Sequence, residues 1–226
     1  MEALAVRMHR PIRAPWLGRV PYDQGLALQA EAAVRAHAGE ERLLLLEHEP
    51  VFTLGRNASR ADVLFTPERC RELGIEVREC DRGGKVTYHG PGQLVGYPVL
   101  NLAPDRKDVK RYVTDLEAVL IRALADFGIT ATRSPERERV TSVWVGNEKI
   151  AAIGIHIARW VTTHGFALNV TDEPLPFFSG IVPCGITDGG VTTMERLLGR
   201  RPTLEETAAR VRARFGEVFG REVLPA

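Results

Sequence analysis

Cysteine is scarce in this sequence, and the long apolar runs of membrane proteins are missing. The 226 residues contain three cysteines, Cys70, Cys80 and Cys184, and such an odd, sparse count argues against a disulfide framework. No Cys pair or Cys/His cluster has the spacing of zinc ligands, so we expect no metal site. The longest aliphatic run, Leu43 to Leu46, is too short to cross a bilayer, and the first residues carry no signal-like apolar segment. We therefore expect a reducing, cytoplasmic location and no membrane partner.

Excess charge and phosphate-binding glycine motifs are missing as well. The formal net charge of +1 excludes the basic surplus of a dedicated DNA-binding domain, so no nucleic acid partner is expected. Neither G-x-G-x-x-G nor G-x-x-x-x-G-K-[ST] occurs, which argues against a dinucleotide or P-loop site. Lysine is rare, because the 30 cationic side chains comprise only four lysines and hence 26 arginines. Genomic base composition or adaptation to heat can explain the bias toward arginine, but a lysine at position 149, where arginine dominates the chain, invites a functional explanation.

Length and composition are typical of one globular domain, which we expect to span residues 1–226. Hydrophobic residues make up 44% and charged residues 26% of the chain, as in ordinary soluble proteins. Periodic apolar positions and start signals predict helices at 23–37, 66–74, 108–127 and 203–219, with Thr66, Asp108 and Thr203 as N-caps. Strands are expected at 43–47, 51–54, 75–78, 143–145, 149–158 and 160–170, the last three as antiparallel neighbours with a tight turn at 146–147. Because these elements do not alternate as β-α-β-α, the sequence favours an α+β fold.

The most unusual segment is Asp81–Gln93, in which five of thirteen residues are Gly or Pro. Its glycines permit a close approach of the backbone to a ligand, and consecutive N–H groups can hold an oxyanion or a carbonyl oxygen. Arg82, Thr87, His89 and Gln93 can all form directed hydrogen bonds. The pattern indicates a ligand-binding segment, but a glycine-rich hairpin turn with incidental polar residues explains it equally well.

Cys184 is the candidate nucleophile among the three cysteines. It lies between Pro183 and Gly185, so the chain direction is restrained on one side and space is left beside the sulfur on the other. A thiol in such a loop can have free backbone N–H groups as oxyanion donors. The alternative is a small buried hydrophobic residue, which is the usual role of a cytosolic cysteine and which fits Cys70 and Cys80 better.

Lys149 and His164 are two further candidates, each within a predicted strand. Lys149 follows the turn at 146–147 and is itself followed by small and apolar residues. A lysine that such neighbours desolvate has a lowered pKa and can act as a base, whereas a surface lysine beside a turn is the ordinary alternative. His164 is one polar side chain among small and apolar ones, and a hydrogen-bonded core histidine is the alternative there.

Together these motifs resemble the lipoyl(octanoyl) transferase family. The resemblance covers about residues 20–195, in the family's order, and departs from its pattern at Ser142, where the family has Gly. The matching segments are Arg82–Gln93, Lys149–Gly154, His164–Asn169 and Pro183–Gly185, with support from Glu47–Gly55 and from the helix with Tyr22 and Gln29.

The resemblance implies a fold, a reaction and a set of site residues. The fold is that of biotin and lipoate protein ligases, with a larger mixed sheet packed by helices and a smaller sheet. The reaction moves an octanoyl group from acyl carrier protein to a lysine of a lipoyl domain, such as the glycine cleavage H protein or a 2-oxoacid dehydrogenase E2 subunit, without a cofactor. By residue matching, Cys184 is the acyl-thioester nucleophile, Lys149 activates it, and Gln93 and His164 support the site. The implied substrate-binding residues are Arg82, Gly83, Gly84, Lys85, Val86, Thr87, Tyr88, His89, Ala152, Ile153, Gly154, Gly165, Phe166 and Ala167.

Two other functions remain open from the sequence. An ATP-dependent lipoate or biotin ligase shares the fold but needs no nucleophilic cysteine, and a non-catalytic module would bind the carrier without forming an adduct. For the acyl chain we expect a groove whose floor and walls are Gly83, Gly84, Ala152, Gly154 and Gly165. For the acidic carrier we expect an arginine-rich docking face, with Arg7, Arg10, Arg13 and Arg19 as one candidate.

Overall fold

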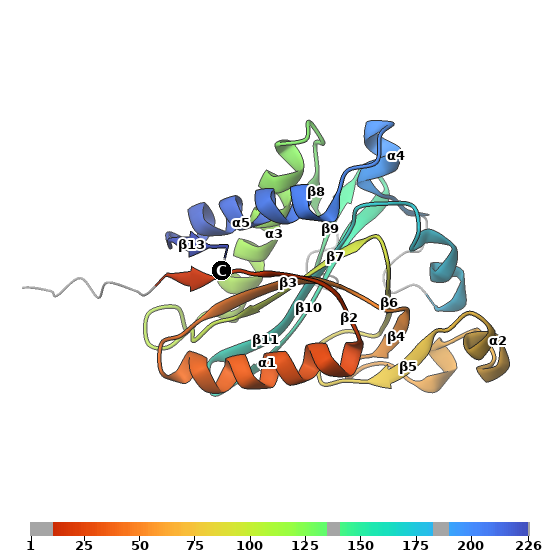
Figure 1. The fold of residues 1–226 in the computed structure, drawn as a ribbon, viewed down its shortest axis with the longest axis horizontal. Helices are drawn as coiled ribbons and strands as arrows, with labels where there is room; N and C mark the ends of the chain where they lie inside the picture. Colours follow the sequence, from red (N-terminus) through yellow and green to blue (C-terminus); the bar gives the residue numbers. More distant parts are fainter. Residues whose placement is uncertain (1–10, 135–140, 183–189, 226) are drawn as a thin grey trace, which may run out of the picture.

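The computed structural model describes residues 11–134, 141–182 and 190–225, and its two sheets are the larger and the smaller sheet that the sequence predicts (Figure 1). The larger sheet consists of β1 (Ile12–Arg13), β2 (Trp16–Val20), β3 (Arg42–His48), β7 (Gln93–Val99), β8 (Thr132–Arg133), β9 (Ser142–Val145), β10 (Glu148–Ala158), β11 (Val161–Asn169), β12 (Gly190–Val191) and β13 (Val223–Leu224). Its strands follow the order β13-β1-β3-β7-β11-β10-β9-β8, while β2 pairs with β3 and β12 with β10. The smaller sheet has the order β5-β4-β6 and consists of β4 (Val51–Leu54), β5 (Glu76–Glu79) and β6 (Val86–His89).

Helices cover both faces of the larger sheet, as Figure 1 shows. Helix α1 (Tyr22–His37) lies against one face, and α3 (Val109–Ala125) and α5 (Leu204–Phe219) pack together on the other. The shorter elements are α2 (Pro67–Glu72), α4 (Met194–Leu198) and the 3-10 turns η1 (Arg60–Asp62) and η2 (Leu175–Gly180). The α+β class predicted from the order of elements is confirmed.

The central strand β3 shows why the sequence requires cover on both faces. Leu43 and Leu45 pack in the core under α3 and α5, whereas Leu44 and Leu46 pack on the side of α1. All four side chains are 0–2% exposed. A continuous apolar run is typical of a strand that is buried on both faces, because successive side chains point to opposite sides.

The predicted helix starts are present as side-chain caps. Thr66 Oγ1 accepts a hydrogen bond from the backbone N–H of Arg69 at 3.2 Å, and Asp108 caps α3 in the same way at 2.9 Å. Thr203 Oγ1 caps α5 by accepting from the N–H of Glu206 at 3.0 Å. Each such cap contributes about 1 kcal/mol by satisfying a donor that the helix itself leaves unpaired.

Strands β6 and β7 replace part of what the sequence presents as a glycine-rich loop. Strand β6 pairs with β4, and β7 pairs with both β3 and β11 in the centre of the larger sheet. Gly96 and Pro98 weaken the strand signal of β7, but Gly96 has a packing reason, because a Cβ there would collide with the ring of Phe166. The predicted antiparallel set β9, β10 and β11 is confirmed, with Gly146 at a positive φ of 57° in the first turn.

Across the described part of the chain, no helix combines the length and the apolar character that a membrane span requires.

Candidate active site

A cavity of about 360 Å³ opens where β6 and the preceding loop approach β10 and β11. The N-terminal part of α3 adds Val109 and Val113 to its wall. The residues that line it are Asn57, Arg82, Gly83, Gly84, Lys85, Val86, Thr87, His89, Tyr97, Val109, Val113, Thr141, Ser142, Lys149, Ala152, Ile153, Gly154, Ile155, His164, Gly165, Phe166 and Ala167. Three segments that are far apart in the sequence, at 82–89, 149–155 and 164–167, therefore meet in one concave site.

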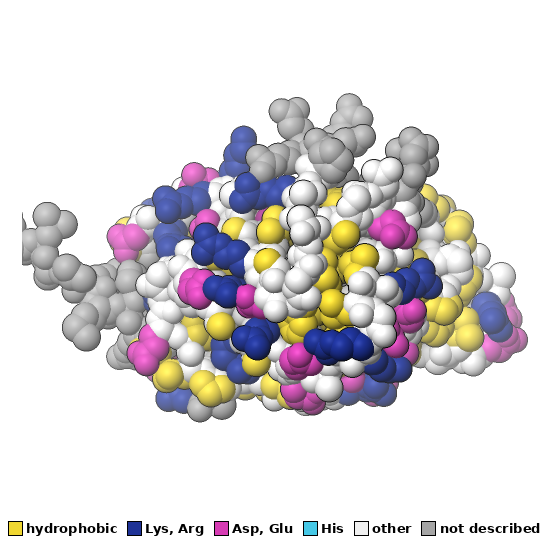
Figure 2. Space-filling view, turned by 90° about the horizontal axis from the view of Figure 1, so that it is seen from above, with side chains coloured by type: hydrophobic (Ala, Val, Ile, Leu, Met, Phe, Trp, Pro, Cys, Tyr) yellow, Lys and Arg dark blue, Asp and Glu magenta, His cyan; other side chains and the backbone are white. Residues whose placement is uncertain are grey.

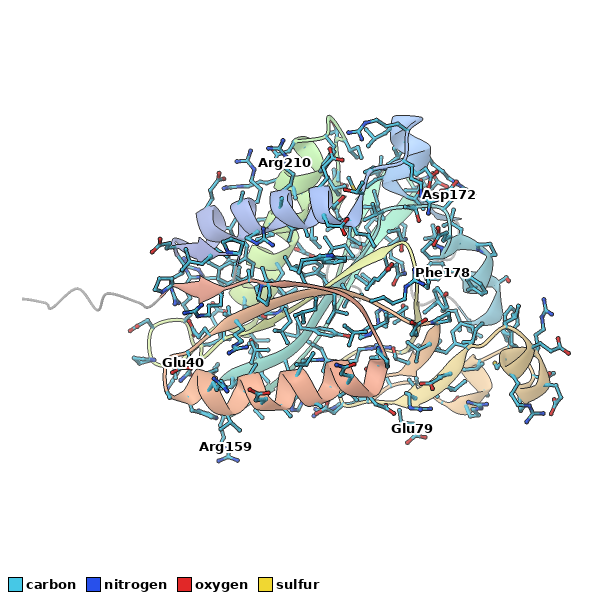
Figure 3. All side chains as sticks on the ribbon, viewed as in Figure 1. Glu40, Glu79, Arg159, Asp172, Phe178 and Arg210 are labelled. Carbon is cyan, nitrogen blue, oxygen red and sulfur yellow. The ribbon has the colours of Figure 1, made fainter. Side chains whose placement is uncertain are left out.

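The residues predicted to bind substrate line this cavity, with the exception of Tyr88. Tyr88 is fully buried in the core of the smaller sheet, where its ring stacks on Phe177 at 4.9 Å between centroids. Phe178 on η2 meets the same ring edge-on at 6.0 Å and lies beside the smaller sheet in Figure 3. The Tyr88 side chain therefore packs away from the cavity: alternation along β6 directs Thr87 and His89 to the cavity and Tyr88 into the core of the smaller sheet.

Lys149 lies at the cavity rather than on the open surface. Its side chain is half-buried, and its backbone pairs with Trp144 on β9 and with Val191 on β12. The pairing of β9 with β10 shifts between Lys149 and Ala151, as in a β-bulge. As a result the consecutive residues Ile150 and Ala151 both belong to the core under α3, while Lys149 lines the cavity.

The predicted nucleophile, Cys184, lies outside the described residues. The described chain before it ends at Val182, whose N–H donates to the carbonyl oxygen of Asp62 at 2.9 Å. After it the description resumes at Gly190, which pairs with Glu148, the neighbour of Lys149 on β10. Of the other cysteines, Cys70 is 3% exposed in the core of the smaller sheet and Cys80 is half-buried.

Arg82 is a buried cation in the cavity wall, 7% exposed. Its Nη2 donates to the backbone oxygen of Thr53 at 2.7 Å and to Thr53 Oγ1 at 2.8 Å, and its Nη1 donates to the oxygen of Gly83 at 3.1 Å. Gly55 makes this packing possible, since a Cβ there would lie 2.5 Å from the oxygen of Gly84 and 2.8 Å from Nη1. All these hydrogen-bond acceptors are uncharged, so none of them offsets the guanidinium charge beside the cavity.

The glycines that were expected to shape a groove differ in what surrounds them. A Cβ on Gly154 would lie 3.0 Å from the oxygen of Gly83, which also lines the cavity. A Cβ on Gly165 would instead collide with the backbone oxygen of Gly96 and lie 2.6 Å from Pro98 Cδ. Gly165 is therefore required by sheet packing against β7, and a larger residue there would disturb the sheet rather than fill the cavity.

His164 is a buried, hydrogen-bonded histidine that also lines the cavity. It is 3% exposed, and its Nε2 lies 2.7 Å from Asp81 Oδ1. Burial lowers the pKa of His164, and the contact with Asp81 only partly opposes this shift. For Asp81, burial raises the pKa of the carboxyl, but the hydrogen bond from His164 and the nearby His156 outweigh burial and hold it below its usual range. At neutral pH the pair is thus a neutral imidazole that donates to a carboxylate.

His89 and His48 form a second group of buried histidines next to the cavity. Burial, aided by the charges of His48 and Arg82, holds the pKa of His89 well below its usual value. His48 is fully buried, with Nδ1 2.8 Å from the oxygen of Val20 and Nε2 2.7 Å from the hydroxyl of Tyr97. Because a carbonyl only accepts, Nδ1 of His48 carries the proton and Tyr97 donates to Nε2. Burial lowers the pKa of His48 to about 4.

Sequence reasoning missed several residues of this site. Tyr97 lies on the missed strand β7, and Asn57, Thr141, Ser142 and Ile155 carry no pattern that separates them from their neighbours. Val109 and Val113 belong to the apolar stripe of α3, which predicted a core position rather than a cavity wall. Among the missed residues, only Val109 and Val113 carried a signal in the sequence, namely this apolar stripe.

Arg13 and Arg19, the described members of the expected arginine-rich docking face, do not line the cavity. Arg13 lies on β1 near the other edge of the larger sheet, and Arg19 pairs with Glu47 at 3.0 Å. Arg7 and Arg10 lie outside the described residues. On the face that carries α3 and α5, Lys and Arg side chains are interspersed with Asp and Glu (Figure 2). Lys85 is an exposed cation that does line the cavity.

Solved structures place this architecture among the lipoate and biotin ligase folds. A lipoate-protein ligase A bound with ATP superimposes with a TM-score of 0.79 at 15% identity, covering 96% of this chain and 89% of that one. A biotin protein ligase from Aquifex aeolicus gives a TM-score of 0.53 at 14% identity, covering 94% of this chain and 70% of that one. At such low identity these similarities establish the fold and nothing further.

Sequence relatives narrow this class. The model of the lipoyl protein ligase A/B catalytic domain matches residues 21–216. An octanoyltransferase of Caldicellulosiruptor bescii is 47% identical over 94% of this chain and 93% of its own length. An octanoyltransferase of Geobacter metallireducens is 46% identical over 88% of this chain and 89% of its own length. The chain belongs to the octanoyltransferase family.

Proposed function

We propose that this protein transfers an octanoyl group from octanoyl-acyl carrier protein, through a thioester at Cys184, to the acceptor lysine of a lipoyl domain. Lipoyl domains of 2-oxoacid dehydrogenase E2 subunits and the glycine cleavage H protein are the acceptors. The observation that carries the proposal is the position of Lys149, one of four lysines in the chain, in the wall of a largely apolar cavity. The octanoyltransferase relatives support the same acyl group.

The cavity offers an apolar surface for an eight-carbon chain. Val109, Val113, Ile153 and Phe166 contribute apolar groups, and Gly154 lines the cavity beside them without a side chain. Six methylene groups at about 0.8 kcal/mol each give roughly 5 kcal/mol of gross binding free energy. The polar loop at 82–85 lines the same cavity, so the apolar wall has a polar neighbour that can hold a carbonyl oxygen.

The chemistry proceeds in two steps that need no nucleotide. In the first step the Cys184 sulfur bonds to the acyl carbon, the carrier's C–S bond breaks, and the carrier thiol leaves with a proton. In the second step the acceptor amine bonds to the acyl carbon, and the C–S bond to Cys184 breaks. We assign the proton transfers to Lys149: as a neutral amine it takes the Cys184 proton, and as an ammonium it stabilises the thiolate. Arginine cannot do this, because its guanidinium stays protonated.

Mass spectrometry after mixing with octanoyl-carrier tests the proposal directly. We expect an octanoyl adduct on Cys184 that Cys184→Ser abolishes. Cys70→Ala and Cys80→Ala are the matched controls and should retain it. An undiminished adduct in Cys184→Ser would refute the mechanism. Failure to form any adduct would also refute it, and would leave a carrier-binding module or an ATP-dependent ligase.

An ATP-dependent ligase is the second candidate, because the lipoate ligase neighbour is bound with ATP. For octanoyl transfer, turnover with octanoyl-carrier must be the same with and without ATP. For a ligase, free octanoate and ATP must together give the acylated lipoyl domain, and the Cys184→Ser variant must remain active.

A further inference from the structure

A chain of hydrogen bonds joins the cavity residue His89 to the strand that carries Lys149. His89 Nδ1 lies 3.2 Å from Gln93 Oε1, and Gln93 Nε2 donates to Asn169 Oδ1 at 2.9 Å. Asn169 Nδ2 donates to the backbone oxygen of Thr192 at 3.1 Å, and the N–H of Thr192 donates to the oxygen of Lys149 at 3.0 Å. The side chains of His89, Gln93 and Asn169 are buried, at 8%, 1% and 4% exposure.

The backbone carbonyl of Thr192 determines which group donates and which accepts at each of these side-chain hydrogen bonds. The carbonyl of Thr192 can only accept, so Asn169 must direct its NH2 group there and its oxygen toward Gln93. Gln93 must then direct its NH2 group toward Asn169 and its oxygen toward His89. Since that oxygen also only accepts, Nδ1 of His89 must carry the proton, and Nε2 must carry a lone pair.

The surroundings of His89 leave that lone pair available. The His89 ring is stacked parallel to the ring of Tyr22, with 6.5 Å between the centroids, and its centroid lies 6.0 Å from that of His48. Within residues 11–134, 141–182 and 190–225, no polar atom forms a hydrogen bond with Nε2. His89 therefore contributes an acceptor, and no donor, to the cavity that Lys149 also lines.

We propose that Gln93 and Asn169 are positioning residues, which hold His89 as an acceptor for an N–H of the lysine amine that attacks the acyl thioester. This inference rests on the proposed function. An attacking amine must aim its lone pair at the acyl carbon, so its N–H bonds need acceptors behind it. A His89 ring with its proton on Nε2 would instead donate to the amine lone pair and block the attack.

The step balances without a further reactant. The amine nitrogen bonds to the acyl carbon, and the C–S bond breaks with its electron pair on the Cys184 sulfur. The surplus amine proton passes to that sulfur by way of Lys149, while His89 holds the remaining N–H. His89 thus acts on the second step and not on the first, in which no amine substrate takes part.

Nitrogen NMR of the resting protein with labelled histidine tests the tautomer independently of any acyl transfer. We expect His89, identified by the loss of its signals in His89→Asn, to show a protonated Nδ1 and a lone pair on Nε2. Asn169→Leu should give a mixture of tautomers, because Gln93 can then rotate its amide. The control Thr162→Val removes a buried hydroxyl elsewhere on β11, bonded to the oxygen of Pro98 at 2.7 Å, and should leave the tautomer unchanged. A wild-type ring with its proton on Nε2 would overturn the inference, whether or not the protein forms an adduct.

Step-resolved kinetics give the functional test. In Asn169→Leu, transfer from the preformed acyl-enzyme to a lipoyl domain should slow about tenfold, as expected for one lost hydrogen bond in the transition state, while acylation of Cys184 changes little. His89→Gln, whose amide oxygen can replace Nε2, should retain more of the second step than His89→Asn, which lacks an atom there. Equal losses in both steps, or no advantage of His89→Gln, would show a merely structural role. A wild-type protein that never forms the adduct would refute the proposed function, a result distinct from these.

Discussion

Acid should destabilise this protein through His48, which titrates inside the fold. The pKa of His48 is about 4 in the folded chain and about 6.5 in an unfolded one. The unfolded chain therefore binds more protons between these values, so stability is fully present above pH 6.5 and is lost as the pH falls toward 4. Linkage gives a loss of about 2 kcal/mol in the free energy of unfolding at pH 5 relative to pH 8, and about 3 kcal/mol below pH 4.

The assay is urea unfolding at these pH values for the wild type and for His48→Gln. Glutamine can donate to the oxygen of Val20 and accept from Tyr97 without titrating, so the variant should lose about 2 kcal/mol less between pH 8 and pH 5. The control His37→Gln changes an exposed histidine at the end of α1 and should match the wild type. Identical pH dependence in His48→Gln and the wild type would refute the assignment of a buried, neutral His48.

Four further outcomes are expected. Lys149→Arg should still bind the octanoyl-carrier but turn over at least about a hundredfold more slowly, the usual effect of losing an acid-base group; turnover near that of the wild type would show that charge alone suffices. Lys149→Ala should slow alkylation of Cys184 near neutral pH, measured with a thiol reagent, because the thiolate loses its cation. Gly154→Val should shift the acyl-chain profile toward shorter chains, whereas Gly165→Val should lower the melting temperature, and an unchanged profile in Gly154→Val would disprove the assigned position of the chain. Raising the salt concentration should slow acylation by the carrier but not by a small acyl thioester, and Lys85→Glu should remove most of that difference.

The elements that the sequence predicts well are those with local signals. Helix α3 combines an apolar stripe with a capping Asp108, and β9 to β11 are neighbours along the chain with a glycine turn between the first two. Strand β7 has no such signal, because its partners β3 and β11 come from distant segments and its Gly96 serves the ring of Phe166. Its existence depends on packing that a single sequence does not display.

The same distinction holds within the candidate site. The segments around Arg82, Lys149 and His164 could be predicted because each concentrates unusual residue types, and the structure brings all three to one cavity. The direction in which each side chain points could not be predicted. Tyr88 shows this, because its direction depends on which residue of β6 begins the pairing with β4. The buried, hydrogen-bonded state of His48 could not be predicted for a related reason. Its ring nitrogens form hydrogen bonds with Val20 and Tyr97, which lie on two other strands.

The bulge on β10 determines on which side of the strand the Lys149 side chain lies. In a regular strand Lys149 would share a side with Ala151, which is buried in the core under α3. One additional residue places Lys149 on the side of Ala152 instead, at the cavity. Deleting one residue of the Ile150–Ala151 pair would therefore remove the bulge, preserve the strand pairing on both sides of it and leave the amine on the side of Ala152, at the cavity. Straightening β10 at its present length would instead turn the amine toward the core, so the bulge keeps the lysine at the cavity.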